Sequence, residues 1–74
     1  MTSDELKIVG EIAYGFGWQT KLAADVGVSA RTMRRYVSGR YKVPEYVAFH
    51  VMQEVYKRTG ILSNLLNRAG IKHA

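Results

Sequence analysis

The chain has 74 residues, of which 47% are apolar, no cysteine and a formal net charge of +5. A chain this short buries roughly 60% of its unfolded surface, so we expect one small domain over residues 1–74 that dimerisation would help to stabilise. The absence of cysteine excludes disulfides and thiolate metal sites and predicts a cytoplasmic protein. No apolar stretch approaches the ~18 residues of a membrane span, and residues 1–5 lack the pattern of a signal peptide.

Positive charge is concentrated in one segment of the sequence. No acidic residue lies between Asp25 and Glu45, whereas five of the eleven cationic side chains do: Arg31, Arg34, Arg35, Arg40 and Lys42. A face that binds a polyanion needs such a concentration of charge. A solvated basic surface without a partner is the alternative interpretation.

The first predicted helix begins at residues 3–5, where a serine hydroxyl can cap backbone amides and two acids face the positive end of the helix dipole. Gly15-Phe16-Gly17 ends it in a turn. Gly10 interrupts the helix and indicates close packing. Apolar residues recur at helical spacing: Leu6, Val9, Ile12 and Ala13.

Two shorter helices follow. One is predicted from about Trp18 or Gln19 to Val26, and Gly27 stops it. Ser29 is placed to cap the next, which runs to about Val37. The residues predicted to face the core are Leu22, Ala23, Val26, Met33 and Tyr36.

A fourth helix is predicted from about Pro44 to Thr59, because proline fits the first helical position. It is apolar over a wide arc, with Val47, Val51 and Val55 in one stripe and Phe49, Met52 and Tyr56 in a neighbouring one. This arc places it at the centre of the core. Gly60 is expected to end the helix before a last one over residues 62–69. The predicted fold is therefore an all-α, compact bundle of about five helices.

Residues 19–39 form the informative motif. Ala23 is small where two helices would cross, and Gly27 lies at a turn where a positive φ is expected. This segment resembles the helix-turn-helix of the Cro and lambda-repressor-like (XRE-type) family, including a glutamine that opens the second helix. The resemblance covers roughly residues 17–55. The stretches 33–36 and 43–47 are also similar to small anti-CRISPR-associated autorepressors of bacteriophages.

The resemblance implies a duplex DNA partner and a role for each matched residue. The outward positions of the third helix would read base edges in the major groove, and arginine there can pair with guanine O6 and N7: Arg35 first, then Arg31, Arg34 and Ala30. A second set would contact phosphates: Gln19, Ser29, Arg40, Tyr41 and Lys42. The alternative role of each arginine is to bind a phosphate without reading a base. The alternative role of Gln19 and of Ser29 is to cap a helix, and that of Tyr41 is to pack against its neighbours.

Two such domains related by a twofold axis would read half-sites of an inverted repeat about 34 Å apart. We therefore expect a homodimer that represses transcription, of phage or mobile-element origin. The exposed apolar remainder of the last two helices would form its interface: Leu62, Leu65 and Leu66.

Other residues support no competing chemistry. Phe16 and Trp18 are expected to fill the core rather than to stack on bases. His50 and His73 lack metal-ligand spacing, so neither a metal nor another cofactor is expected. No acid pair or triad indicates catalysis, and we expect no enzyme.

Two rival functions remain: a protein-interaction module, such as an antitoxin or adaptor, and a DNA-architectural or recombination accessory factor. A membrane-surface binder is less well supported, since the fourth helix lacks a clean basic face.

Overall fold

The computed structural model describes the backbone of residues 1–68 and the side chains of residues 1–60. Over this range the chain forms four α-helices and no strand: α1 (Ser3–Tyr14), α2 (Trp18–Val26), α3 (Ala30–Val37) and α4 (Glu45–Arg68). The all-α prediction is confirmed, but the predicted number of about five helices is wrong. The backbone of Gly60 stays outside the positive-φ region, and α4 runs through it. An interior glycine costs a helix only about 1 kcal/mol, which its helix-forming neighbours offset.

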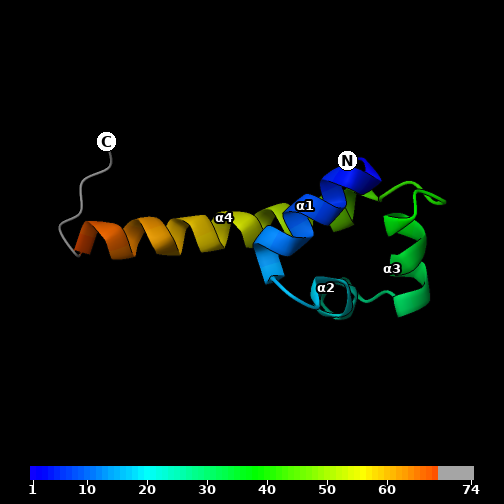
Figure 1. The fold of residues 1–74 in the computed structure, drawn as a ribbon, viewed down its shortest axis with the longest axis horizontal. Coiled ribbons are helices and arrows are strands. Elements are labelled where there is room, and N and C mark those ends of the chain that lie inside the picture. Colours follow the sequence, from blue (N-terminus) through cyan, green and yellow to red (C-terminus); the bar gives the residue numbers. More distant parts are fainter. Residues whose placement is uncertain (69–74) are drawn as a thin grey trace.

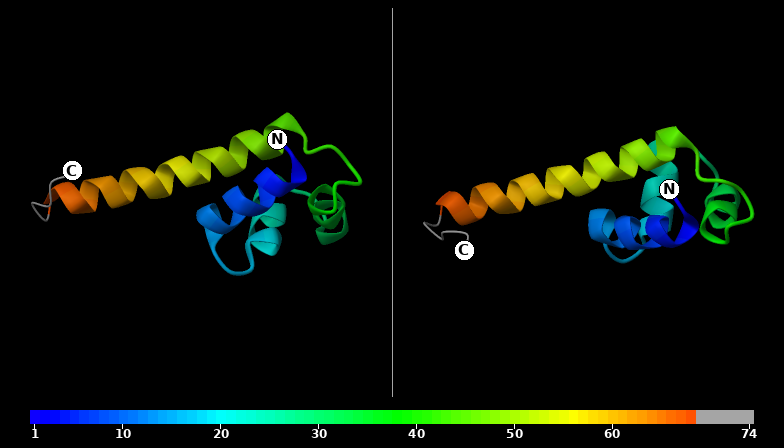
Figure 2. Two further views of the ribbon diagram at one scale, coloured as in Figure 1. Left: turned by 45° about the horizontal axis from the view of Figure 1, so that its top comes forward. Right: turned by 90° about the horizontal axis from the view of Figure 1, so that it is seen from above.

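α1 and α2 pack against one half of α4. α1 lies alongside the N-terminal half of α4, and α3 lies at that same end of the molecule (Figure 1). α2 contacts the other three helices. Both views in Figure 2 show the C-terminal half of α4 extending away from α1, α2 and α3. The molecule is therefore elongated, with extents of 46 × 21 × 20 Å.

The core fills the space between α1, α2, α3 and the first turns of α4. Its buried apolar side chains are Leu6, Ala13, Trp18, Leu22, Ala23, Met33, Tyr36, Val43, Val47 and Val51. The expectation of close packing at Gly10 is confirmed, because a Cβ atom there would lie 2.2 Å from Cε3 of Trp18. This glycine allows the indole ring to lie directly against the backbone of α1.

The residue that caps α1 differs from the prediction. Thr2, not Ser3, is the N-cap: its hydroxyl accepts a hydrogen bond from the Glu5 amide at 3.1 Å. The Glu5 carboxylate in turn accepts one from the Thr2 amide at 2.8 Å. This reciprocal capping box holds the carboxylate near the positive end of the helix and lowers the pKa of Glu5.

Two predictions of burial are wrong, and one apolar residue at helical spacing in α1 lies outside the core. Ile12 is 56% exposed, because α1 packs through the face that carries Leu6, Gly10 and Ala13. Phe16 is fully exposed, since the positive-φ glycines on both sides of it turn the chain outward. The stripe predicted to help make α4 central to the core is also exposed: Phe49, Met52 and Tyr56. Only one side of α4 is covered by the other helices, so one stripe suffices for the core.

Candidate nucleic-acid interface

The connection between α2 and α3 has the local structure that the sequence predicted. Gly27 adopts a φ of 74° in the left-handed region, where glycine carries no steric cost. The Val28 amide then donates to the Ala23 carbonyl at 3.0 Å. Ser29 caps α3, because its hydroxyl accepts a hydrogen bond from the Thr32 amide at 3.1 Å. The capping role predicted for Ser29 is therefore confirmed.

Three arginines share the outward face of α3. Met33 and Tyr36 are buried on the opposite face, at 1% and 8% exposure. Residues three and four apart are neighbours on a helix surface, so the arginines lie together: Arg31, Arg34 and Arg35. The first two are exposed and the third is half-buried. Ala30, also exposed, begins the same helix.

These cations have no carboxylate partner among the described residues. The ion pairs found there join Lys7 to Asp4, Lys57 to Glu54, and His50 to Asp25 and Glu54. None of them involves α3 or the loop that follows it. The positive field of the arginines is therefore not neutralised within the part of the chain that the structure describes, as binding to a polyanion requires.

The loop after α3 extends the basic face. Val43 is 5% exposed and anchors the loop in the core, while Arg40, Tyr41 and Lys42 remain at the surface. The Tyr41 amide donates to the Arg35 carbonyl at 3.2 Å, which holds the loop against the last turn of the helix. The cations of the loop therefore lie next to those of α3.

Arg35 and Tyr41 also contact each other through their side chains. The guanidinium carbon of Arg35 lies 5.1 Å from the centre of the Tyr41 ring, within cation–π range. Nη1 of Arg35 donates to the Tyr41 hydroxyl at 3.1 Å. This hydroxyl accepts from arginine and keeps its own proton to donate elsewhere. Tyr41 thus restricts the orientation of the Arg35 side chain.

The other predicted contact residues are placed differently. Gln19 is half-buried in the first turn of α2, at the end of this helix far from α3. Gly17, the N-cap of α2, offers no side-chain hydrogen bond, so the first amides of the helix lack a side-chain cap. Leu62, Leu65 and Leu66 belong to α4, but their side chains lie outside the described residues.

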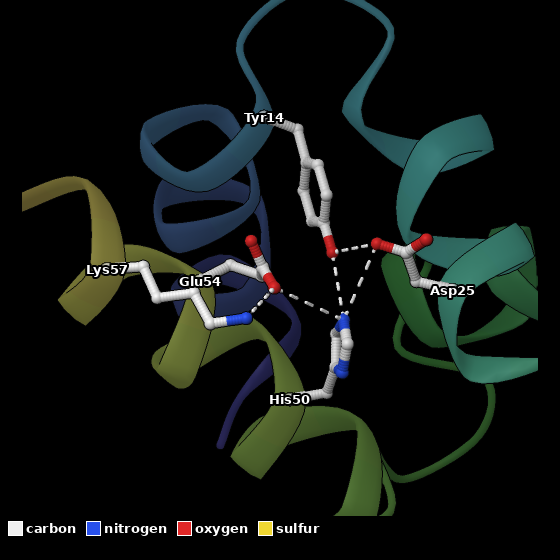
Figure 3. Close-up of polar contacts among 5 residues, drawn as sticks. All are labelled: Tyr14, Asp25, His50, Glu54 and Lys57. Atoms are coloured by element: carbon white, nitrogen blue, oxygen red, sulfur yellow. Dashed lines mark hydrogen bonds and ion pairs between the residues drawn. The ribbon is translucent and has the colours of Figure 1, made fainter.

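A polar cluster that the sequence analysis missed joins α1, α2 and α4 (Figure 3). The Tyr14 hydroxyl donates to Oδ2 of Asp25 at 2.7 Å. Nε2 of His50 lies 3.1 Å from the same hydroxyl and 3.5 Å from the Asp25 carboxylate. Glu54 lies 3.9 Å from His50, and its Oε1 accepts a hydrogen bond from Nζ of Lys57 at 3.2 Å. Of these contacts, only His50–Glu54 and Glu54–Lys57 join residues three or four positions apart, so only these two could have been predicted from helical spacing.

The electrostatics of this cluster favour a structural role. Burial, followed by the hydrogen bond to Asp25, raises the pKa of the Tyr14 phenol. The hydrogen bond from Tyr14, followed by the contact with His50, lowers the pKa of Asp25. A phenol that holds its proton more tightly is the opposite of an activated nucleophile. The cluster therefore fastens the end of α1 and the end of α2 to α4.

Comparison of the chain with protein-family models, with curated proteins and with solved structures gave no match. No group of three or more side chains within the described range could hold a metal ion. The helices of this range also include none that is both long and apolar enough to cross a membrane.

Proposed function

We propose that the chain is a sequence-specific regulator of transcription that binds duplex DNA through the major groove. In this proposal α2, the turn at Gly27 and α3 form a helix-turn-helix, and α3 is the helix that enters the groove. The observation that carries the proposal is the cluster of three arginines on the outer face of α3, without carboxylate partners among the described residues. Guanidinium groups bind guanine and phosphate by paired hydrogen bonds.

Arg35 is the residue proposed to read a base. Its contacts with Tyr41 limit the rotamers that it can adopt before DNA binds. A side chain held in place loses less conformational entropy on binding, so its contact is both stronger and more selective. Tyr41 is then a positioning residue for Arg35, and the Tyr41 hydroxyl can donate its own hydrogen bond to a phosphate oxygen.

The remaining predicted contact residues would bind the DNA backbone. Arg40 and Lys42 lie in the loop next to α3, and Gln19 lies at a helix terminus whose amides can face a phosphate. Each phosphate contact contributes about −0.9 to the slope of log K against log salt concentration. In the cell, such a protein would act as a dimeric repressor of its own operon, of phage or mobile-element origin.

Selection of bound sequences from a random duplex library at about 0.15 M salt tests the proposal. The native chain should enrich an inverted repeat with G·C positions. Arg35→Ala should weaken binding about 5- to 150-fold and relax the preference at one position of each half-site. Arg35→Lys should restore charge but not the preference, because lysine lacks the paired donors.

Arg58→Ala is the matched control, since Arg58 is an exposed arginine on α4, away from α3. It should retain the sequence preference. Tyr41→Phe keeps the ring and removes the hydroxyl, so it should weaken the preference less than Tyr41→Ala does. If the native chain enriches no sequence, or if Arg35→Ala binds every duplex as the native chain does, the proposal fails. A protein-interaction module or a DNA-architectural factor would then explain the basic face.

A further inference from the structure

The outer face of α4 carries an apolar stripe that no described residue covers. Phe49, Met52 and Tyr56 are 66%, 46% and 80% exposed. Their spacing of three and four residues places them on one side of the helix, opposite the buried Val47 and Val51. Together with Gln53 and Lys57 they line a shallow groove. We refer to Phe49, Met52 and Tyr56 as the outer stripe.

The size of the outer stripe exceeds what scattered surface residues explain. Since a large aromatic side chain presents 150–250 Å², the exposed fractions correspond to roughly 400 Å² of surface in one chain. A contiguous apolar patch of this size on a small protein commonly marks an interaction site. Two such stripes in contact would bury roughly 800 Å², which is below the ~1,200–2,000 Å² of a standard interface and fits a dimer of weak, micromolar affinity.

We infer that a second copy of this chain covers the outer stripe, with α4 packed against α4 about a twofold axis. An isologous interface needs a surface that complements itself, and an apolar stripe of aromatic side chains and methionine meets this requirement. Gly60 follows Tyr56 by one turn, and nothing lies within 4 Å of where its Cβ would be. A bare helix surface at this point allows a partner helix to approach closely.

Charge also favours a second copy over a charged partner. The cation that lines the groove, Lys57, already donates to Glu54 at 3.2 Å within the same chain. The stripe therefore presents no unpaired charge to a polyanion or to an acidic protein. The groove is lined by residues of α4 alone, whereas the arginine face belongs to α3, which lies at one end of the molecule (Figure 1), so pairing through the outer stripe covers none of the three arginines. The inference specifies the dimer of the proposed function but does not depend on DNA binding.

Mass in solution, measured without DNA by light scattering at 10–200 micromolar, tests the inference. The native chain should have twice its monomer mass of 8.3 kDa. Phe49→Glu should lower the mass to that of the monomer while circular dichroism still reports a helical fold. Phe16→Glu is the matched control, because Phe16 is also an exposed phenylalanine but lies outside the stripe; this variant should remain dimeric.

Cross-linking provides a second readout that does not depend on the folding of Phe49→Glu. The chain has no cysteine, so a cysteine introduced at Met52 or at Tyr56 can couple only to a second copy. A short bismaleimide should join either variant into a covalent dimer, but not Ile8→Cys, which places the thiol on the exposed side of α1. A monomeric native chain, a dimeric Phe49→Glu, or failure of both cysteine variants to cross-link would overturn the inference. Loss of DNA binding alone would leave it intact.

Discussion

Replacing Gly10 by alanine tests the packing of α1 on α2. The new methyl carbon would lie 2.2, 2.6 and 2.7 Å from three ring atoms of Trp18, which is 7% exposed and cannot move into solvent. Overpacking a core costs about 1–3 kcal/mol, and the upper part of this range applies because several contacts fall below 3 Å. Alanine also gains about 1 kcal/mol of helix propensity over glycine. We therefore expect a net loss of about 2 kcal/mol.

Gly60→Ala, made in the Phe49→Glu background so that no partner helix meets the new methyl group, is the control for helix propensity, because Gly60 also lies inside a helix but has no neighbour within 4 Å of that group in its own chain. This variant should gain about 0.5–1 kcal/mol. In a domain of this size 1 kcal/mol changes Tm by about 4–8 °C, so Gly10→Ala should lower Tm by roughly 10 °C while Gly60→Ala raises it. Thermal and urea unfolding followed by circular dichroism measure both changes.

Trp18→Leu provides the second arm of this experiment, because a smaller side chain removes the ring atoms that meet the new methyl group. In this background Gly10→Ala should cost less than it does in the native chain. If Gly10→Ala is as stable as the native chain, or if its cost is unchanged by Trp18→Leu, then the close contact between α1 and the indole ring does not limit residue 10.

Two further predictions concern the cap of α3 and the polar cluster that joins α1, α2 and α4. Ser29→Ala removes the cap of α3 and should cost about 1 kcal/mol in urea unfolding, whereas Ser29→Asp, which also accepts from the Thr32 amide, should not; equal stability of the two variants would contradict this. Tyr14→Phe should flatten the pH profile of stability. The lowered pKa of Asp25 stabilises the fold above the pKa of Asp25 in the unfolded chain, and this stabilisation is lost as pH falls through the pKa of Asp25 in the folded chain. The raised pKa of Tyr14 stabilises the fold below about pH 10, and this stabilisation is lost as pH rises through the pKa of Tyr14 in the folded chain. This is checked by measuring the urea midpoints of the native chain and of Tyr14→Phe from about pH 2 to about pH 11. Parallel pH profiles of the two proteins would refute the prediction.

Local signals predicted the helices of the first half of the chain. Glycine at a position that needs positive φ and a hydroxyl before a helix act through their immediate neighbours, so Gly27 and Ser29 could be identified from sequence. Met33 and Tyr36 follow from helical spacing, which also places the arginines on the opposite face.

Features that depend on how many neighbours a helix has could not be predicted in this way. The periodicity of α4 indicates two apolar stripes, but whether both are buried depends on how many layers pack on it, and only one side is covered. The cluster of Tyr14, Asp25 and His50 joins residues up to 36 positions apart, so no local spacing reveals it. The contact between Arg35 and Tyr41 depends on how the loop folds back after α3.

The short loop between α3 and α4 has a consequence for which DNA sites a pair of chains could occupy. Because buried Val43 and the bond from the Tyr41 amide to Arg35 fix this loop at both ends, the direction of α3 follows the direction of α4. In a pair joined along α4, the crossing angle of the two long helices would therefore set the distance between the two arginine faces. A substitution on α4, far from any base pair, would then alter the preferred spacing of half-sites without altering the sequence of either one.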